Sequence, residues 1–320
     1  MKYNFENAGK RSELYTNIRR YFLEKNYLET DTPTLSPDLI PEPTIDNFGT
    51  TFINEFKGSR EMYLIPSPEV FMKRLIAAGS GSVFQISKCF RNCEQIGEIH
   101  NPEFSMLEYY TVGFDEMDSA SLTEDFLKKT AIRGCQQSVL APWLKMSVRE
   151  AMIKYADTDI EKLQRAAGLR EHALSKGFHI PGPESWEDTF NRIFCTLVEP
   201  SLPVDRPVML YDYPRQIKCL AEAKGFYRRR WELYINGIEV ANCYKEETDS
   251  SRVQQYYEEE YSRLVQERSD NGKVIPDIDS DYYKVFDTFP PCSGVAIGLD
   301  RLLMAQIGSR DIRDVLLFAF

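Results

Sequence analysis

The sequence predicts an α+β fold in which amphipathic helices are combined with strands that pair as hairpins. Apolar side chains recur with helical spacing over residues 8–26. Side chains alternate between two faces at 83–90 and again at 104–110, as expected for two strands joined by a long polar loop. Strand-forming residues return over 207–249, where Asn236-Gly237 is typical of a tight hairpin turn.

Composition restricts the class of protein. The chain has 320 residues, 42% of them hydrophobic, which is enough for one large domain or two smaller ones. Its net charge is −10, so general binding to nucleic acid is not expected, because such affinity comes mainly from Lys and Arg. The basic run Arg228-Arg229-Arg230 is either a local phosphate-binding patch or, as we prefer, a solvated loop.

Cysteine usage points to a cytoplasmic protein. The seven cysteines show no paired spacing, which indicates reduced thiols. Cys89 and Cys93 lack a second cysteine pair, and the chain has only three histidines, so zinc is not expected. No run approaches 18 apolar residues, so no membrane span is expected either.

The first elements are a helix and a short strand. The helix carries an apolar stripe that includes Leu14 and Phe22. A strand follows at 27–32, and Pro33 prevents it from pairing further. Residues 34–60 are rich in Pro, Asp, Thr and Gly, so we expect a loop with short extended pieces.

A short strand and a helix of about ten residues are predicted between residues 63 and 79. Ser67 suits the N-cap of this helix, and Pro68 suits its first position, where the missing N–H would be unpaired anyway. Glu69 then lies in the first turn, where the helix dipole favours a carboxylate whether or not it has a function.

The middle of the chain, from about 118 to 200, is interpreted as a helical insertion packed on the sheet. It shows no internal repeat and no low-complexity tract. Its helices, and one more after the hairpin, are expected at 118–132, after the capping box Ser147 to Glu150, at 160–168, at 186–198 and at 250–271.

Three ordered stretches resemble the motifs of a known family, the class II aminoacyl-tRNA synthetases. Residues 14–33, with FLEKNYLETDTP, are similar to motif 1, and residues 292–306, with GVAIGLDRLLM, to motif 3. Residues 83–110, with FRN and HNPEFSMLEYY, are similar to motif 2 of the lysyl branch. The nearer resemblance is to the short lysyl-synthetase paralogues called elongation factor P lysine ligases. Two features indicate this: motif 3 has the form CSGVAIGLDR, and motif 1 begins close to the first residue of the chain.

The resemblance implies a class II catalytic fold, an antiparallel sheet flanked by helices, as one catalytic domain over residues 1–320. It implies a homodimer formed through motif 1, although an ordinary amphipathic helix followed by a proline would show the same periodicity. It further implies that ATP and Mg²⁺ activate lysine or (R)-β-lysine. No anticodon-binding barrel precedes motif 1, so tRNA is not the expected acceptor, and a lysine side chain of elongation factor P is.

For ATP, the resemblance implies five binding residues around motifs 2 and 3. Arg91 would bridge the amino-acid carboxylate and the α-phosphate, as a planar guanidinium can, and with Arg301 it is the expected catalytic residue. Phe104 and Arg301 match the positions that sandwich adenine. His100 and Glu103 complete this part of the set.

A metal pair is implied as well. Glu232 and Glu239 lie seven residues apart across the Asn236-Gly237 turn, so a hairpin would bring their carboxylates together. Hard oxygen ligands suit Mg²⁺ bound to phosphates, and both residues would then also contribute to ATP binding. A structural hairpin with exposed glutamates is the alternative.

For the amino acid, the resemblance implies a pocket with several carboxylates. A buried ammonium group needs carboxylates facing it, because an unpaired buried charge is costly. Glu108, Tyr110 and Glu246 match the residues that hold the lysine ε-amine. Asn242 matches a contact to the carboxylate, and Glu69 a contact to the α-amino group.

Ala296 is the expected determinant of α-lysine against β-lysine. Lysyl-tRNA synthetases have Gly at this position, and elongation factor P ligases share the Ala and prefer (R)-β-lysine. A methyl group near the substrate α-carbon is expected to disfavour an amino group there and to tolerate one on the β-carbon.

The loop of motif 2 departs from the family pattern. Cys93 intervenes before Glu94, and Arg91 to His100 spans nine positions where the family has eight. The Arg usual before the His is missing, which weakens the expected contact with the terminal phosphates. Cys243 also stands where Gly is usual. A trimmed tRNA ligase and a catalytically silent regulatory paralogue remain the alternative functions.

Overall fold

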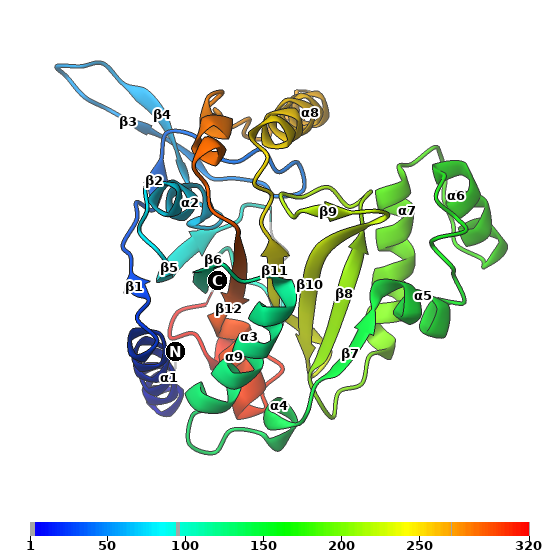
Figure 1. Ribbon diagram of the computed structural model, residues 1–320, viewed down its shortest axis with the longest axis horizontal. Coiled ribbons are helices and arrows are strands. Elements are labelled where there is room, and N and C mark those ends of the chain that lie inside the picture. The colour runs from blue at the N-terminus through cyan, green and yellow to red at the C-terminus, as the bar shows by residue number, and fades with distance from the viewer. Residues whose placement is uncertain (1–3, 94–96, 270, 320) are drawn as a thin grey trace.

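The computed structural model describes residues 4–93, 97–269 and 271–319 (Figure 1). Its strands are β1 (Leu28–Glu29), β2 (Leu35–Ser36), β3 (Gly49–Phe52), β4 (Arg60–Leu64), β5 (Val83–Phe90), β6 (Glu103–Val112), β7 (Leu144–Ser147), β8 (Val208–Pro214), β9 (Ala223–Lys224), β10 (Tyr227–Ile235), β11 (Ile238–Lys245) and β12 (Cys292–Gly298). Its α-helices are α1 (Phe5–Glu24), α2 (Glu69–Ala77), α3 (Glu116–Thr130), α4 (Gln137–Leu140), α5 (Val148–Ala156), α6 (Ala166–Ser175), α7 (Trp186–Ile193), α8 (Ser250–Arg268) and α9 (Leu299–Ile307). Shorter helical segments lie at Phe194–Val198, Glu199–Ser201, Tyr282–Asp287 and Ile312–Asp314.

Nine strands form one large sheet in the order β1-β5-β6-β12-β11-β10-β8-β7, with β9 paired to β10. Pairing is antiparallel throughout the centre and parallel only at the two outer pairs, β1 with β5 and β7 with β8. The predicted hairpin turn is confirmed, because Asn236 and Gly237 both have positive φ and join β10 to β11. The expected antiparallel sheet flanked by helices is therefore confirmed.

One face of the sheet is covered by α1, α3 and α9. Their apolar side chains pack against alternate residues of the central strands, for example Phe22 of α1 against Phe84 and Tyr109. The same core contains Cys243, so this side chain points away from the opposite face of the sheet. The first and last parts of the described chain meet here, because Asn7 donates to the carbonyl of Asp314 at 2.9 Å.

The segment 118–200 divides into two parts. Its first helix, α3, shares the core of the central sheet. Helices α5 and α7 form a second core with β8, and Figure 1 shows α5, α6 and α7 gathered beside β8 and the edge strand β7. The capping box Ser147 to Glu150 at the start of α5 is confirmed.

Two helix boundaries were predicted wrongly. Helix α2 starts at Glu69, so Pro68 and not Ser67 is the N-cap residue. The Ser67 hydroxyl accepts a long hydrogen bond, of 3.4 Å, from the Glu69 N–H. The helix expected at 160–168 begins at Ala166 instead. Turn contacts to Asp159 occupy the preceding residues, since short acidic side chains compete with the helix for backbone N–H groups.

The interpretation of Arg228-Arg229-Arg230 as a solvated loop was also wrong. The three residues lie on β10. Arg229 forms ion pairs with Asp115 at 2.9 Å and with Glu116 at 2.8 Å. The side chain of Arg230 is only 14% exposed and pairs with Glu232. The run is part of the sheet, acidic neighbours offset the charges of Arg229 and Arg230, and Arg228 donates to the carbonyl of Ala221.

A small sheet, ordered β2-β4-β3, projects from the body as a hairpin of β3 and β4 (Figure 1). Within the described ranges, no helix is long and apolar enough to cross a membrane.

Candidate active site

The face of the sheet opposite α1 and α3 carries polar residues in register. Residues directly opposite each other on paired strands share one face. Glu108 of β6 pairs with Ala296 of β12, which pairs with Asn242 of β11. One step further along the strands, Tyr110 pairs with Gly294. The sheet therefore places predicted site residues from three distant stretches of chain in adjacent rows.

Two cavities lie over these rows and share a boundary. The first, of about 670 Å³ including space open to solvent, is lined by the predicted nucleotide residues Arg91, His100, Phe104, Glu239 and Arg301. The second, of about 510 Å³ on the same measure, is lined by the predicted amino-acid residues Glu69, Glu108, Tyr110, Asn242, Glu246 and Ala296. Four residues line both cavities: Arg91, Met106, Asn242 and Ala296.

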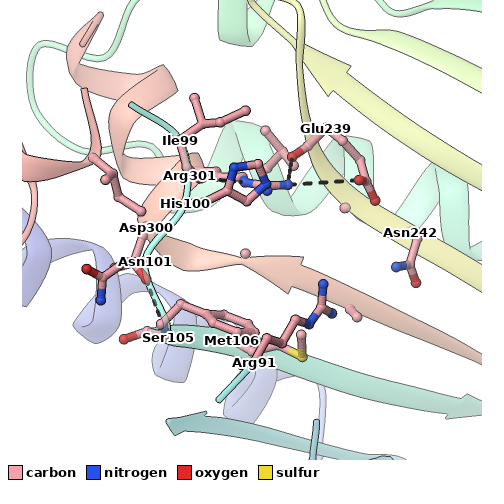
Figure 2. Close-up of a pocket in the computed structure, with 16 residues that line it drawn as sticks. Arg91, Ile99, His100, Asn101, Ser105, Met106, Glu239, Asn242, Asp300 and Arg301 are labelled. Atoms are coloured by element: carbon pink, nitrogen blue, oxygen red, sulfur yellow. Dashed lines mark hydrogen bonds and ion pairs between the residues drawn. The ribbon is translucent and has the colours of Figure 1, made fainter. Parts of the chain in front are cut away.

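Arg301 is held in place at one wall of the first cavity. Its guanidinium donates to the carbonyl of Glu239 at 3.0 Å and to the carbonyl of Ile99 at 3.3 Å. Figure 2 shows Arg301 and His100 on one side of this cavity and Arg91 with Met106 on the other. The two guanidinium groups therefore face a common space from opposite sides.

Arg91 lies on the ring of Phe104, with its guanidinium carbon 5.2 Å from the ring centre. Its Nε is buried and has no hydrogen-bond partner among the described residues. Two of the predicted ATP-binding residues, Glu103 and Glu232, do not line this cavity. The side chain of Glu103 is 42% exposed and pairs with Lys88 at 3.1 Å.

The predicted metal pair is only partly directed into the nucleotide cavity. Glu239 lines it, whereas Glu232 accepts hydrogen bonds from Tyr213 at 2.5 Å and Tyr234 at 2.8 Å and pairs with Arg230. Burial and the Glu232 carboxylate raise the pKa of Glu239 to about 7. A divalent cation beside Glu239 would offset this charge, and hard carboxylate oxygens suit Mg²⁺, so Glu239 fits as a ligand, whereas Glu232 is already engaged by Tyr213, Tyr234 and Arg230.

The amino-acid cavity contains a carboxylate with an unused oxygen. Glu108 is 3% exposed, and one of its oxygens accepts a hydrogen bond from Tyr110 at 2.5 Å. Its other oxygen is buried and has no hydrogen-bond partner within the described part of the chain. Burial, followed by the charge of Glu69, raises the pKa of Glu108 to about 8. A cationic group beside this oxygen would favour the carboxylate form.

Lys73, which the sequence reasoning missed, connects two other carboxylates of this cavity. Its side chain is fully buried, and its ammonium lies 2.5 Å from Glu69 and 2.7 Å from Glu246. Burial alone would lower its pKa, but these carboxylates raise it well above the usual value. Burial also raises the pKa of Glu246 to about 7, an effect that Lys73 opposes. The only sequence signal was a lysine four residues after Glu69, on the same face of a helix.

Gly294 is required by the close approach of two site residues. A Cβ at this position would lie 2.4 Å from a carboxylate oxygen of Glu246 and 2.5 Å from the ring of Tyr110. Ala296 has room for its methyl group at the boundary of the two cavities. The departure at Cys243 leaves the site unchanged, because that side chain lies in the core on the other face.

The departures in the motif 2 loop fall partly outside the described residues, at 94–96. Cys93 is exposed and has positive φ, at 53°. The loop is anchored beyond the gap, where the N–H of Ile312 donates to the carbonyl of Glu98 at 2.7 Å.

This arrangement matches a known protein class. The family described as tRNA synthetases class II (D, K and N) matches residues 2–320, so the chain belongs to the class II synthetase family. The protein is accordingly an ATP-dependent ligase.

Several curated relatives carry one name, "Elongation factor P--(R)-beta-lysine ligase". The protein of that name from Hamiltonella defensa is 34% identical over 318 residues, which cover 98% of this chain and 94% of the relative. Those from Proteus mirabilis and Photorhabdus laumondii are 33% identical over 323 and 320 residues, with the same coverage. These matches confirm the resemblance inferred from the three motifs.

Replacing Gly294 by Ala tests the packing of the site without changing a polar group. We expect Gly294→Ala to lower the free energy of unfolding by about 1–3 kcal/mol, because the added methyl displaces Glu246 and Tyr110. Gly9→Ala is the matched control, since Gly9 lies in α1 with open space around it. The control is expected to raise stability by about 0.5–1 kcal/mol in denaturant unfolding. Equal effects of the two substitutions would contradict the packing argument.

Proposed function

We propose that the protein activates lysine or (R)-β-lysine with ATP and transfers the product to a lysine side chain of elongation factor P. The observation that carries this proposal is that the nucleotide cavity and the carboxylate-rich cavity meet at Arg91, Asn242 and Ala296. The names of the curated relatives supply the acceptor, elongation factor P, and the donor, (R)-β-lysine.

Activation joins a substrate carboxylate to the α-phosphorus of ATP, and pyrophosphate leaves. Arg91 borders both cavities, so its guanidinium is suited to hold the carboxylate and the α-phosphate together. Arg301 and Phe104 are suited to stack on the adenine from the walls of the first cavity. Mg²⁺ held at Glu239, with Glu232 behind it, would neutralise charge on the departing pyrophosphate.

Transfer then needs only a positioned amine. The nitrogen of the uncharged amine attacks the carbonyl carbon of the adenylate, AMP leaves with the bonding electron pair, and the proton lost from the nitrogen passes to solvent. We propose that the residues act by position and charge, without a covalent enzyme intermediate. The amine of the substrate side chain is assigned to Glu108, Tyr110 and Glu246, and the unused oxygen of Glu108 supports this assignment.

A homodimer formed through α1 and β1 belongs to this proposal. β1 is an outer strand of the large sheet, and Leu23 and Leu28 beside that edge are each 53% exposed. An outer strand flanked by exposed apolar side chains favours pairing with a second copy. tRNA is not proposed as the acceptor.

Arg91→Ala tests the assigned role in activation. We expect ATP–pyrophosphate exchange with (R)-β-lysine to fall by about 10²-fold or more, because a charge that stabilises the transition state is removed. Arg165→Ala, at an exposed position on the insertion, is the control and should exchange normally. A folded Arg91→Ala protein with near-normal exchange would refute the assignment.

The affinity for lysine-type substrates should rise as the pH is raised from 6 to 8. In the free protein, Glu108 and Glu246 have pKa values raised to about 8 and about 7, so both are partly protonated in this range. An ammonium ligand binds the carboxylate forms, so its binding releases protons. The association constant then rises by up to about tenfold per pH unit for each proton released. Titration calorimetry in two buffers with different ionisation enthalpies measures this release. Proton-neutral binding at pH 7 would contradict the assignment of the amine to these carboxylates.

Ala296→Gly tests the choice of donor. Removing the methyl group is expected to shift the ratio of kcat/KM values toward α-lysine by about 10–200-fold. Exchange assays with both isomers check this, and charging of tRNA with lysine is measured alongside. The methyl argument fails if the unmodified enzyme uses α-lysine as well as β-lysine and the substitution changes nothing.

A further inference from the structure

We propose that Glu42, on the loop between β2 and β3, is a further specificity-determining residue, which binds the amino group nearest the reacting carboxylate of the substrate. This inference rests on the proposed function. It adds a second acidic group beside Glu69 at the end of the amino-acid cavity that borders Arg91.

Glu42 reaches the site from outside the central sheet. It is partly buried, and it lines the amino-acid cavity together with Glu69 and Arg91. Within the described ranges, its carboxylate takes part in no hydrogen bond and no ion pair. A carboxylate in this position is available to a ligand.

The loop that carries Glu42 is held by a buried arginine. Arg268, 3% exposed, donates to the carbonyls of Pro43 at 3.1 Å and of Ile45 at 2.5 Å, and that of Glu42 lies 3.5 Å away. The same guanidinium lies 3.5 Å from Asp46. Because several backbone groups of one short loop are fixed by one side chain, the direction of Glu42 into the cavity is built into the fold.

The loop is also fixed relative to Arg91. The N–H of Asn92 donates to the carbonyl of Asp46 at 2.8 Å, in an isolated antiparallel bridge. Asn92 directly follows Arg91 in the chain. The positions of Glu42 and of the residue assigned to the substrate carboxylate are therefore coupled through the backbone.

The nearby cations only partly offset the charges of the acidic groups at this end of the cavity. Burial and the neighbouring Glu69 raise the pKa of Glu42 to about 7, while Arg91, Lys73 and Arg230 act in the opposite direction. The ammonium of Lys73 is already bound between Glu69 and Glu246. An ammonium group placed between the two acidic residues would remove this repulsion.

The geometry identifies which substrate group that is. Arg91 is assigned to the carboxylate, so the amino group next to Arg91 is the one on the α- or β-carbon. The amine at the far end of the substrate is assigned to Glu108 and Glu246 instead. The cavity therefore has acidic groups for both ammonium groups of a diamino acid.

The test compares substrates that differ by one amino group. 6-Aminohexanoate keeps the carboxylate and the terminal amine of lysine and of β-lysine but lacks the second amino group. We expect Glu42→Gln to lower kcat/KM in ATP–pyrophosphate exchange by about tenfold or more for the diamino acids, and to change that for 6-aminohexanoate by less than about twofold. Glu246→Gln should lower kcat/KM for all three substrates. Glu61→Gln, at an exposed position on strand β4, should lower it for none of them.

Two results would overturn the inference. Equal losses for all three substrates in Glu42→Gln would assign Glu42 a general structural role, and unchanged exchange would remove it from the site. An unmodified enzyme that exchanges with no lysine-type substrate would instead refute the proposed function.

Discussion

The site depends on the antiparallel register of β6, β12 and β11. This register brings Glu108, Ala296 and Asn242 into one row although they are separated by up to 188 positions in the chain. A slip of one residue on any of these strands would turn its side chains to the opposite face and remove them from the cavities. The core under α1, α3 and α9 makes such a slip costly, because the alternate residues of the same strands are buried there.

The second constraint is charge balance in a buried space. Carboxylates that hold an ammonium ligand repel one another when the ligand is away. Lys73 offsets part of this repulsion by lying between Glu69 and Glu246. Burial and the repulsion that remains raise the pKa of an acidic group, as they do for Glu108. Under the proposed function, affinity for a cationic substrate and stability of the empty pocket are thus opposed, and the buried lysine is a compromise between them.

Local features were predictable where neighbouring residues decide the conformation. The Asn236-Gly237 turn follows from the tolerance of these residues for positive φ, and the capping box at Ser147 from short-range hydrogen bonds. The Arg228-Arg229-Arg230 run was misread because its partners, such as Asp115, are remote in the chain. Glu103 matched the pattern expected for ATP binding, yet its side chain pairs with Lys88 on the neighbouring strand.

The sequence by itself determined the family, the order of the three motifs and most of the candidate site residues, because these depend on residue types at characteristic spacings. It also determined the alternation that separates the two faces of the sheet. Only the tertiary structure decided that Lys73 is buried between two carboxylates and that Arg268 directs Glu42 into the same cavity. The physical reason is that electrostatic partners are selected by distance in space, and those distances arise only when remote segments pack together.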